Sequence, residues 1–591
     1  MKNRKSTIKK VTLYLLAVVM VTSIAVCEFL PGDFFAPDTE DPVIAEPPPP
    51  PPTTEPQPPP TEPPPTTESP PATEPPPVTE DPSEPEPEPP PHPATLFFPG
   101  AVEGTDPMNT AFRYDYDIMV NGEIVSDYTR SDPIDFGMDH EYTNVQGVTT
   151  FRGNNFRSSA AWGNVNVRNE TLTTKWQINI DGLQGWTGAG WTGQPVIVRW
   201  RNDIRQIMNI YPEKKAKEDL VEVIYGTMDG IIRFLDLDDG KPTRAPINTF
   251  SPIKGAVMID PRGLPLLYVG QGVFTGHPLG HRIYSLIDYE VLHFTNGLDS
   301  FRYRTWRSFD GNPLVCAASD TMVLPGENGI LYTVKLNTRF NIRAGTISLD
   351  PEVVKFRYKT PLSRVLGIES SVVGFSHYAF FTDNSGLVSC VDLNTMTPVW
   401  IQHCTDDTDS TPLFDIEEDG GFSLYTACEV DLRNRADLAY IRKLNAITGE
   451  ILWEHSYRCA FDDHVNGGVL ASPILGKGDI DGGIIFFVAK TITGKGGGVL
   501  VNLDKATGEV IWETWFRSYG WSSPVDVYTE SGKSYIIVCD ASGNVHLVEG
   551  RTGKVLRSIN IRGNVEASPA IFENKIVVGT RAQVIFCIEI G

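Results

Sequence analysis

The chain has 591 residues, with 50 Lys and Arg against 74 Asp and Glu, which gives a formal net charge of -24. Nucleic-acid binding needs clustered basic residues for phosphate contacts, so this balance argues against that class of function. Hydrophobic residues make up 40% of the chain, which is enough for a core over several hundred residues.

The first 27 residues are typical of an export signal. Five basic residues among the first ten precede the uncharged apolar run from Val11 to Cys27. This run is at the short end of what can span a bilayer. Residues 24–27 also resemble a lipobox, although Val26 stands where such boxes carry Gly, Ala or Ser. We therefore expect a protein outside the cytoplasmic membrane, tethered by an uncleaved anchor or a lipid, with a cleaved signal and free secretion as the alternative.

Residues 28–93 form an acidic, Pro-rich tract. Of the 48 Pro in the chain, 27 lie between Pro37 and Pro93, together with 13 acidic and no basic residues. Such a composition buries too little apolar surface to fold, and it favours an extended polyproline II chain. It predicts a disordered stalk that presents the next domain at the cell surface. Residues 94–147 are then expected to form a lead-in with a short β-hairpin.

From about residue 190 the chain repeats a four-strand pattern. A unit opens at a Ser-Pro or similar pair, passes through two strands joined by a polar turn, and ends in a Thr-Gly turn before a strand that carries Trp, as in Ala506 to Trp512. Gly in that turn supplies a positive φ, and the Trp ring can pack between adjacent sheets. Such units predict an all-β fold, an eight-bladed β-propeller. The eight starts lie at or near Pro195, Ala256, Pro313, Ser371, Pro412, Ala471, Ser523 and Ala567.

The eighth unit ends at Gly591, before its fourth strand can form. The segment 172–180, which contains Trp176, precedes the first unit and matches the strand that the last unit lacks. We expect the two to pair, because pairing removes an open sheet edge and makes residues 148–591 one closed propeller. The alternative is that 172–180 is only an edge strand of the first blade.

The Ser-Pro openings and the Thr-Gly-x-x-x-Trp endings resemble the pyrroloquinoline-quinone (PQQ) repeat. This propeller family includes quinoprotein alcohol dehydrogenases and the outer-membrane assembly lipoprotein BamB. The run from Phe151 to Arg157 resembles the Phe-Arg-Gly-Asn lead-in that often precedes such propellers, so the resemblance covers about residues 148–591.

The resemblance implies two possible functions. In the enzymes, Glu, Asn and Asp side chains hold Ca²⁺ beside PQQ, and many have two adjacent cysteines. This chain has no adjacent cysteine pair and no motif that matches the calcium ligands. We therefore favour a non-catalytic binding or assembly module whose partner is a surface or envelope protein or a glycan. A PQQ-dependent dehydrogenase with Ca²⁺ is the alternative.

One rim of the propeller is the expected binding site. In a propeller the loops from strand d to the next strand a, and from strand b to strand c, lie on one face around the channel. Aromatic and acidic residues just before each strand a are therefore expected to be neighbours, and they suit a sugar, a peptide or a cationic ligand. The candidate ligand-binding residues are Trp191, Glu369, Asp409, His464, Trp521 and Glu566.

Two weaker patterns concern metals and disulfides. Asp479 and Asp481 resemble half of a calcium loop, but the later ligands are missing, so we predict turn residues and no metal site. Cys404 and Cys459 follow or occupy Trp-containing strands in neighbouring units and are the candidates for a disulfide. The cysteines within apolar, strand-like runs are expected to be buried core residues.

Overall fold

We describe the protein from a computed structural model, which covers residues 92–591 except 110, 192, 364, 433–435, 462–464 and 493–496. The predicted export signal, Cys27 and the predicted stalk up to residue 91 lie outside the described residues. In the part that is described, His92–Gly591 forms one compact unit, and no helix there is long and apolar enough to cross a membrane.

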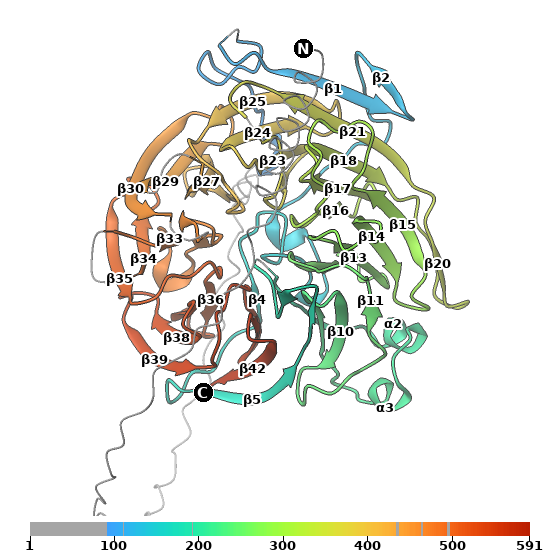
Figure 1. The fold of residues 1–591 in the computed structure, drawn as a ribbon, viewed down its shortest axis with the longest axis vertical. Coiled ribbons are helices and arrows are strands. Elements are labelled where there is room, and N and C mark those ends of the chain that lie inside the picture. The colour runs from blue at the N-terminus through green and yellow to red at the C-terminus, as the bar shows by residue number, and fades with distance from the viewer. Residues whose placement is uncertain are drawn as a thin grey trace, which may run out of the picture. The chain divides into compact units, whose positions relative to one another are not determined.

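Eight antiparallel sheets stand around a common axis as the blades of a β-propeller (Figure 1). The predicted fold class is therefore confirmed. In order from the axis outward, the first four blades consist of β8 (Val196–Arg199), β9 (Glu222–Gly226), β10 (Ile231–Asp236) and β11 (Ile247–Asn248); β12 (Val257–Ile259), β13 (Leu266–Gly270), β14 (Gly280–Ser285) and β15 (Val291–Asn296); β16 (Leu314–Cys316), β17 (Thr321–Gly326), β18 (Ile330–Lys335) and β21 (Glu352–Lys359); and β22 (Val373–Phe375), β23 (Tyr378–Thr382), β24 (Leu387–Asp392) and β25 (Thr397–His403).

The other four blades follow the same order. They consist of β26 (Leu413–Ile416), β27 (Phe422–Ala427), β29 (Ala436–Asn445) and β30 (Ile451–Ala460); β32 (Ile474–Leu475), β33 (Gly483–Ala489), β34 (Gly498–Asp504) and β35 (Val510–Phe516); β36 (Val525–Tyr528), β37 (Ser534–Cys539), β38 (Asn544–Glu549) and β39 (Val555–Asn560); and β40 (Ala570–Phe572), β41 (Lys575–Thr580), β42 (Val584–Ile590) and β5 (Leu172–Asn179).

Shorter elements decorate the ring. The hairpin β1 (Asp115–Val120) and β2 (Glu123–Val125) extends blade 3 outward, whereas β3 (Gln146–Val148) and β4 (Ala161–Trp162) add to the inner strands of blades 1 and 8. The remaining strands are β6 (Gly182–Leu183), β7 (Trp186–Thr187), β19 (Arg339–Asn341), β20 (Thr346–Ser348), β28 (Glu429–Val430) and β31 (Gly467–Gly468). The helices are α2 (Asn202–Ile207) and α3 (Pro212–Lys215), with 3-10 turns at Pro93–Thr95, Asp139–Glu141 and Gly478–Ile480.

Burial within a blade follows the distance from the axis. The second strands, such as β17 and β37, are buried along their whole length because a neighbouring sheet covers each face. The outer strand β39 is exposed or half-buried throughout. The hydrophobic core is therefore divided among the interfaces between blades, where runs of Val, Ile, Leu and Phe from adjacent sheets meet.

The Trp of one blade packs on the Gly of the next. Trp400 of β25 lies against Gly449 in the c–d turn of blade 5, and its indole N–H donates to the carbonyl of Ala446 at 3.0 Å. Trp453 of β30 contacts Gly508 of blade 6 in the same way, with its N–H on the carbonyl of Lys505 at 3.0 Å. The expectation that the Trp packs between sheets is confirmed, and the motif joins two successive blades.

The strand expected at 172–180 is β5. It pairs antiparallel with β42, so the sheet of blade 8 holds chain from both ends of the propeller, with teal β5 beside dark red β42 in Figure 1. Trp176 then contacts Gly240 in blade 1 and donates its indole N–H to Leu237 at 2.8 Å. The contact between Trp and Gly thus also joins the last blade to the first.

The lead-in run Phe151–Arg157 lies inside the ring, where Figure 1 shows the cyan segment near the centre. Arg152 is fully buried and donates to the carbonyls of Pro473 and Pro524, both at 2.6 Å. Arg157 donates to the carbonyls of Val372, Asn312 and Pro313 at 2.9–3.1 Å. Burial lowers the pKa of each guanidinium to about 10, so both stay charged at neutral pH. The carbonyl of Phe156 also accepts the backbone N–H of Phe414 in blade 5. The motif is therefore a structural plug that links blades 3 to 7 at the beginning of their innermost strands.

Candidate functional site

The propeller face that carries the d–a and b–c loops, named here the d–a face, contains two groups of three carboxylates. Within each group the oxygens lie within 4.8 Å of one another. The first group is Asp310, Glu327 and Glu369, and the second is Asp407, Asp409 and Glu429. Asp310, Glu369, Asp407 and Asp409 come from d–a loops, whereas Glu327 and Glu429 follow the second strands of blades 3 and 5.

The first group has a basic partner. The ammonium of Lys254, from the d–a loop before blade 2, forms an ion pair with Asp310 and lies 3.6 Å from Glu369 Oε1. Burial opposes the charged ammonium, but the three carboxylates together raise the pKa of Lys254 well above its ordinary value. Lys254 also lies 5.9 Å from the ring centroid of Trp191, which is a cation–π contact.

The second group is held by amides. The Nδ2 of Asn384 donates to Asp409 at 3.2 Å and to Asp407 at 3.4 Å, and it also donates to Glu369 of the first group at 2.8 Å. Asn466 Nδ2 donates to Glu429 Oε2 at 2.8 Å. Burial, with the neighbouring carboxylates, raises the pKa of Asp407, Asp409 and Glu429 well above the ordinary range. These carboxylates therefore resist ionisation unless positive charge reaches them.

The contacts connect the two groups into one arc, which we call the carboxylate arc. It runs from Trp191 through Lys254 to the first group, across Asn384 to the second group, and through Asn466 to Trp521, whose indole N–H donates to the Asn466 carbonyl at 3.2 Å. Four of the candidate rim residues therefore lie in the arc: Trp191, Glu369, Asp409 and Trp521. Trp191 is 8% exposed, so its ring contacts Lys254 and offers little surface to a ligand.

The other two candidates lie elsewhere. Glu566 contacts Asn564 and lies 3.6 Å from Arg581 on blade 8, with no contact to the arc among the described residues. His464 lies outside the described residues.

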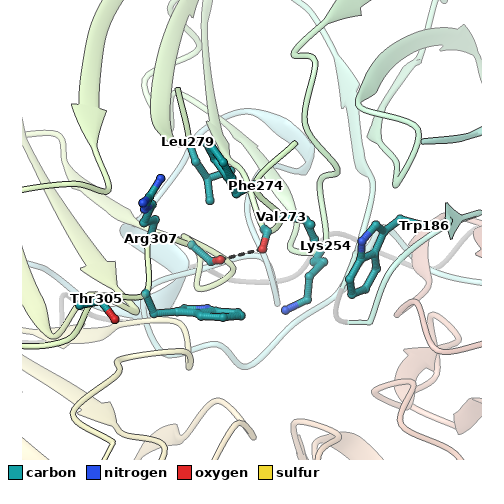
Figure 2. A pocket seen from close by; sticks show the side chains of 10 residues that line it. Trp186, Lys254, Val273, Phe274, Leu279, Thr305 and Arg307 are labelled. Carbon is teal, nitrogen blue, oxygen red and sulfur yellow. Dashed lines mark hydrogen bonds between the residues drawn. The ribbon is translucent and has the colours of Figure 1, made fainter. Parts of the chain in front are cut away.

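Beside the arc, between the loops of blades 1 to 3, is a cavity of about 220 Å³. Trp186 and Arg307 stand at opposite sides of it with Lys254 between them, and Phe274 and Leu279 complete the apolar wall (Figure 2). Trp306, 50% exposed, and Phe274, 53% exposed, present their rings to solvent at its edge. An apolar cavity beside a charged arc can take a ligand that has both an apolar and a charged part.

The weaker predictions have different outcomes. Asp479 accepts a hydrogen bond from the backbone N–H of Ser534 in the next blade at 2.9 Å, whereas Asp481 accepts one from its neighbour Gly482 within a turn. Neither belongs to a group of potential metal ligands in the described chain. The disulfide between Cys404 and Cys459 is not formed, because both are free, buried thiols that pack in separate hydrophobic clusters. Burial raises the pKa of each thiol to about 12, so neither is reactive.

The sequence reasoning missed Glu327, Asn384 and Glu429 as site residues. All three stand just after the second strand of their unit, where a polar residue was interpreted as part of a turn. The signal that could have found them is position, because a b–c loop of one blade lies beside the d–a loops of its neighbours.

Comparisons with known proteins find a family match for part of the chain and distant similarities to solved structures. Residues 437–527 match the family model described as "Outer membrane protein assembly factor BamB", so the resemblance to PQQ-repeat propellers is confirmed for that part. BamB from Moraxella catarrhalis is 15% identical, with 71% of this chain and 100% of that chain covered and a TM-score of 0.43. Quinohemoprotein alcohol dehydrogenase from Pseudomonas putida is 10% identical, with 76% and 80% covered and a TM-score of 0.49. The enzyme from Comamonas testosteroni is 12% identical, with 76% and 81% covered and a TM-score of 0.39. No curated protein matches the chain.

The arc suits a cation better than it suits the quinone that the enzymes use. PQQ carries three carboxylates, and here it would face six more, against Lys254 and the guanidinium of Arg304, which donates to Asn384 Oδ1 at 2.7 Å. A tricarboxylate would add negative charge where burial already disfavours it. The donor set therefore fits a metal ion or an ammonium group, and it does not fit the tricarboxylate.

Proposed function

We propose that this protein is a non-catalytic binding or assembly module that holds a partner on the d–a face of its propeller. The observation that carries the proposal is the apolar cavity with exposed Trp306 and Phe274 beside the carboxylate arc. Exposed aromatic rings next to buried charge are the usual anchors of a binding surface. The match of residues 437–527 to an assembly-factor family supports the same role.

The partner that this surface favours is a protein segment with an apolar side chain next to a basic one. The apolar side chain fills the cavity lined by Trp186, Phe274 and Leu279, and the basic group reaches the carboxylates of the arc. A glycan of the cell surface, stacked on Trp306, is the other candidate.

Capture by the full-length chain tests the proposal. Trp306→Ala removes an exposed ring at the cavity, and Leu452→Ala on the outer strand β30, where Leu452 is 53% exposed, is the matched control. We expect crosslinked surface components to remain with the wild type and Leu452→Ala and to be lost at least about tenfold from Trp306→Ala, as for an interface anchor. Equal capture by both variants contradicts a site at the cavity.

We further propose that the protein lies outside the cytoplasmic membrane, at the cell surface, tethered by residues 1–27 with residues 28–93 as a stalk. The basic and apolar N-terminal pattern and the Pro-rich composition support this arrangement. Brief protease treatment of intact cells should release a soluble fragment cut within residues 37–93. Recovery of the intact protein from the cytosol, untouched by protease, contradicts the proposal.

The second candidate function is a PQQ-dependent dehydrogenase, which the carboxylate arc disfavours because PQQ itself carries three carboxylates. Incubation with PQQ and Ca²⁺, followed by an absorbance spectrum and a dye-linked alcohol oxidation assay, distinguishes the two. Stoichiometric quinone binding with alcohol oxidation would replace the binding-module proposal, and no retained quinone supports it.

A further inference from the structure

The two carboxylate groups of the arc differ in how their charge is balanced. Asp310, Glu327 and Glu369 surround the ammonium of Lys254. For Asp407, Asp409 and Glu429, no ion pair with a basic side chain is formed within the described residues, and the contacting donors are neutral amides. The second group is therefore built like the first, with the position of the cation left open.

Glu429 gives an independent sign that this position receives a ligand. Its side chain is completely buried, and while Oε2 accepts from Asn466, its Oε1 has no hydrogen-bond partner. An unpartnered, buried carboxylate oxygen costs free energy that a bound cation removes. The Glu429 carboxylate offers an oxygen within 4.8 Å of oxygens of Asp407 and Asp409.

The chemistry of the donors indicates the kind of cation. Two oxygens bound to one Ca²⁺ ion, each at about 2.4 Å, are separated by at most about 4.8 Å, and the three carboxylates offer oxygens within that separation. Ca²⁺ accepts flexible sets of carboxylate oxygens, whereas Mg²⁺ demands a near-ideal octahedral set. The described donors are carboxylate oxygens without His or Cys, which favours a hard cation over zinc or copper.

The fold holds the three ligands in place without a metal. Asp407 and Asp409 lie in the loop between β25 and β26, and Glu429 opens β28. The backbone N–H of Glu429 donates to the carbonyl of Asp407 at 2.8 Å, which fixes the two loops to each other. A ready-made arrangement lowers the ordering cost of binding.

We propose that Asp407, Asp409 and Glu429 form a Ca²⁺ site on the d–a face, with Asn384 and Asn466 holding the carboxylates in position. The ligands come from the loop between blades 4 and 5 and from β28, and the site needs no quinone. The ion neutralises the carboxylate group that has no ion pair with a basic side chain among the described residues, and it ties the two segments together.

Calcium titration of the metal-free, full-length chain tests the site. We expect saturable binding by calorimetry with one high-occupancy site and a Tm that rises by about 2–5 °C at saturating Ca²⁺. Mg²⁺ at the same concentration should give a smaller rise. A Tm that is unchanged by Ca²⁺ up to about 10 mM, well above the Kd range of extracellular calcium sites, overturns the proposal.

A matched pair of variants separates this site from general ion effects. Glu429→Gln keeps the shape and the bond to Asn466 but removes a ligand charge, so it should abolish the calcium-dependent rise in Tm. Glu327→Gln in the Lys254 group should keep the calcium response. Equal responses of the two variants to Ca²⁺ overturn the assignment.

The readouts keep this proposal distinct from the proposed function. If Glu429→Gln loses calcium binding and still captures the partner of the wild type, the metal site stands and partner binding is independent of it. If the protein binds Ca²⁺ but captures nothing, the function proposed above fails and the metal site remains.

Discussion

The Gly of the Thr-Gly turn has two separate reasons to be Gly. Gly508 has a φ of +74°, which disfavours any side chain, and a Cβ there would stand 2.8 Å from the ring of Trp453. The sequence indicated the first reason, because Gly in a tight turn is a local signal. The second depends on the Trp of another blade, and no local pattern shows it.

Replacing Gly508 by Ala should therefore cost more than its backbone conformation alone. We expect Gly508→Ala to lower the free energy of unfolding by about 2–4 kcal/mol, because the strained φ and the clash with Trp453 add. Gly420→Ala is the control, since Gly420 has a φ of +84° with no atom within 4 Å of an added Cβ, and it should cost about 1 kcal/mol. Denaturant titration of both variants measures the difference in the free energy of unfolding. Equal losses would mean that the Trp453 ring moves aside without cost.

His281 makes stability depend on pH. The ring is almost completely buried, its nitrogens have no hydrogen-bond partner in the described structure, and burial lowers its pKa to about 3. Below pH 6.5 the unfolded chain takes up a proton that the folded chain refuses, so stability falls as the pH decreases from about 6.5 towards 3.

His281→Phe should remove this part of the pH dependence. The new ring keeps the aromatic neighbours Tyr268 and Phe309. Between pH 7 and pH 5 the free energy of unfolding should fall by about 2 kcal/mol less in the variant than in the wild type. Comparison of the two proteins cancels the buried acids of the arc, which act in the opposite direction. Parallel stability curves for the two proteins would show that His281 does not titrate in this way.

At the scale of elements, an extended antiparallel pairing with β42 holds β5 in blade 8. Seven residue pairs join it to β42, including Thr173 opposite Glu589, and a bulge lies next to Trp176. The partners are more than four hundred residues apart, so sequence reasoning could only infer the pairing by noticing that the last unit lacks a strand. That inference rested on counting units, which is reliable where the repeat is regular.

A disulfide across this pair tests the closure. Thr173→Cys with Glu589→Cys should oxidise spontaneously, because the two Cα atoms face each other across the ladder. The oxidised protein should unfold at a higher temperature than the same protein after reduction, since the bond closes a very long loop of the unfolded chain. Failure of the pair to crosslink in the native protein would show that β5 is not held against β42.

At the scale of the whole molecule, the plug formed by residues 151–157 joins blades through buried hydrogen bonds. Arg157 uses all its donors: Nε on Val372, one amino group on Thr150 and Phe151, and the other on Asn312 and Pro313. The sequence marked this run only as a family lead-in, because neither charge nor periodicity reveals which carbonyls a buried guanidinium will meet. The residues of the carboxylate arc that lie in d–a loops could be predicted, because their position in the repeat alone places them on one rim.

Arg157→Lys should weaken the whole domain although the charge is kept. An ammonium has three donors and cannot span carbonyls of two blades, so buried acceptors stay unpaired. We expect a loss of about 3 kcal/mol or more in the free energy of unfolding. Arg339→Lys, on an exposed hairpin near Asp350, should change it by less than about 0.5 kcal/mol. A loss at Arg157 no larger than at Arg339 would mean that the plug is dispensable.

The Ser-Pro openings also act between blades. The hydroxyl of Ser472 accepts the backbone N–H of Thr411 at 3.2 Å, and the N–H of Ser472 donates to Ser523 at 3.0 Å. The same link repeats from Asn312 through Ser371 at one end to Ser568 at the other. It is absent between the described residues of blades 1 and 2. Thr150, which precedes the plug, instead contacts Gln194 before blade 1 and Asn312 before blade 3.

These hydroxyl links divide the propeller into two parts. Blades 4 to 7 carry the same link on both sides, whereas blades 3 and 8 carry it on one side only. The plug crosses this division, because its contacts reach blades 3 to 7. The carboxylate arc crosses it too: Lys254 lies before blade 2, in the part without the link, and Asp407, Asp409 and Glu429 lie in the part that carries it on both sides.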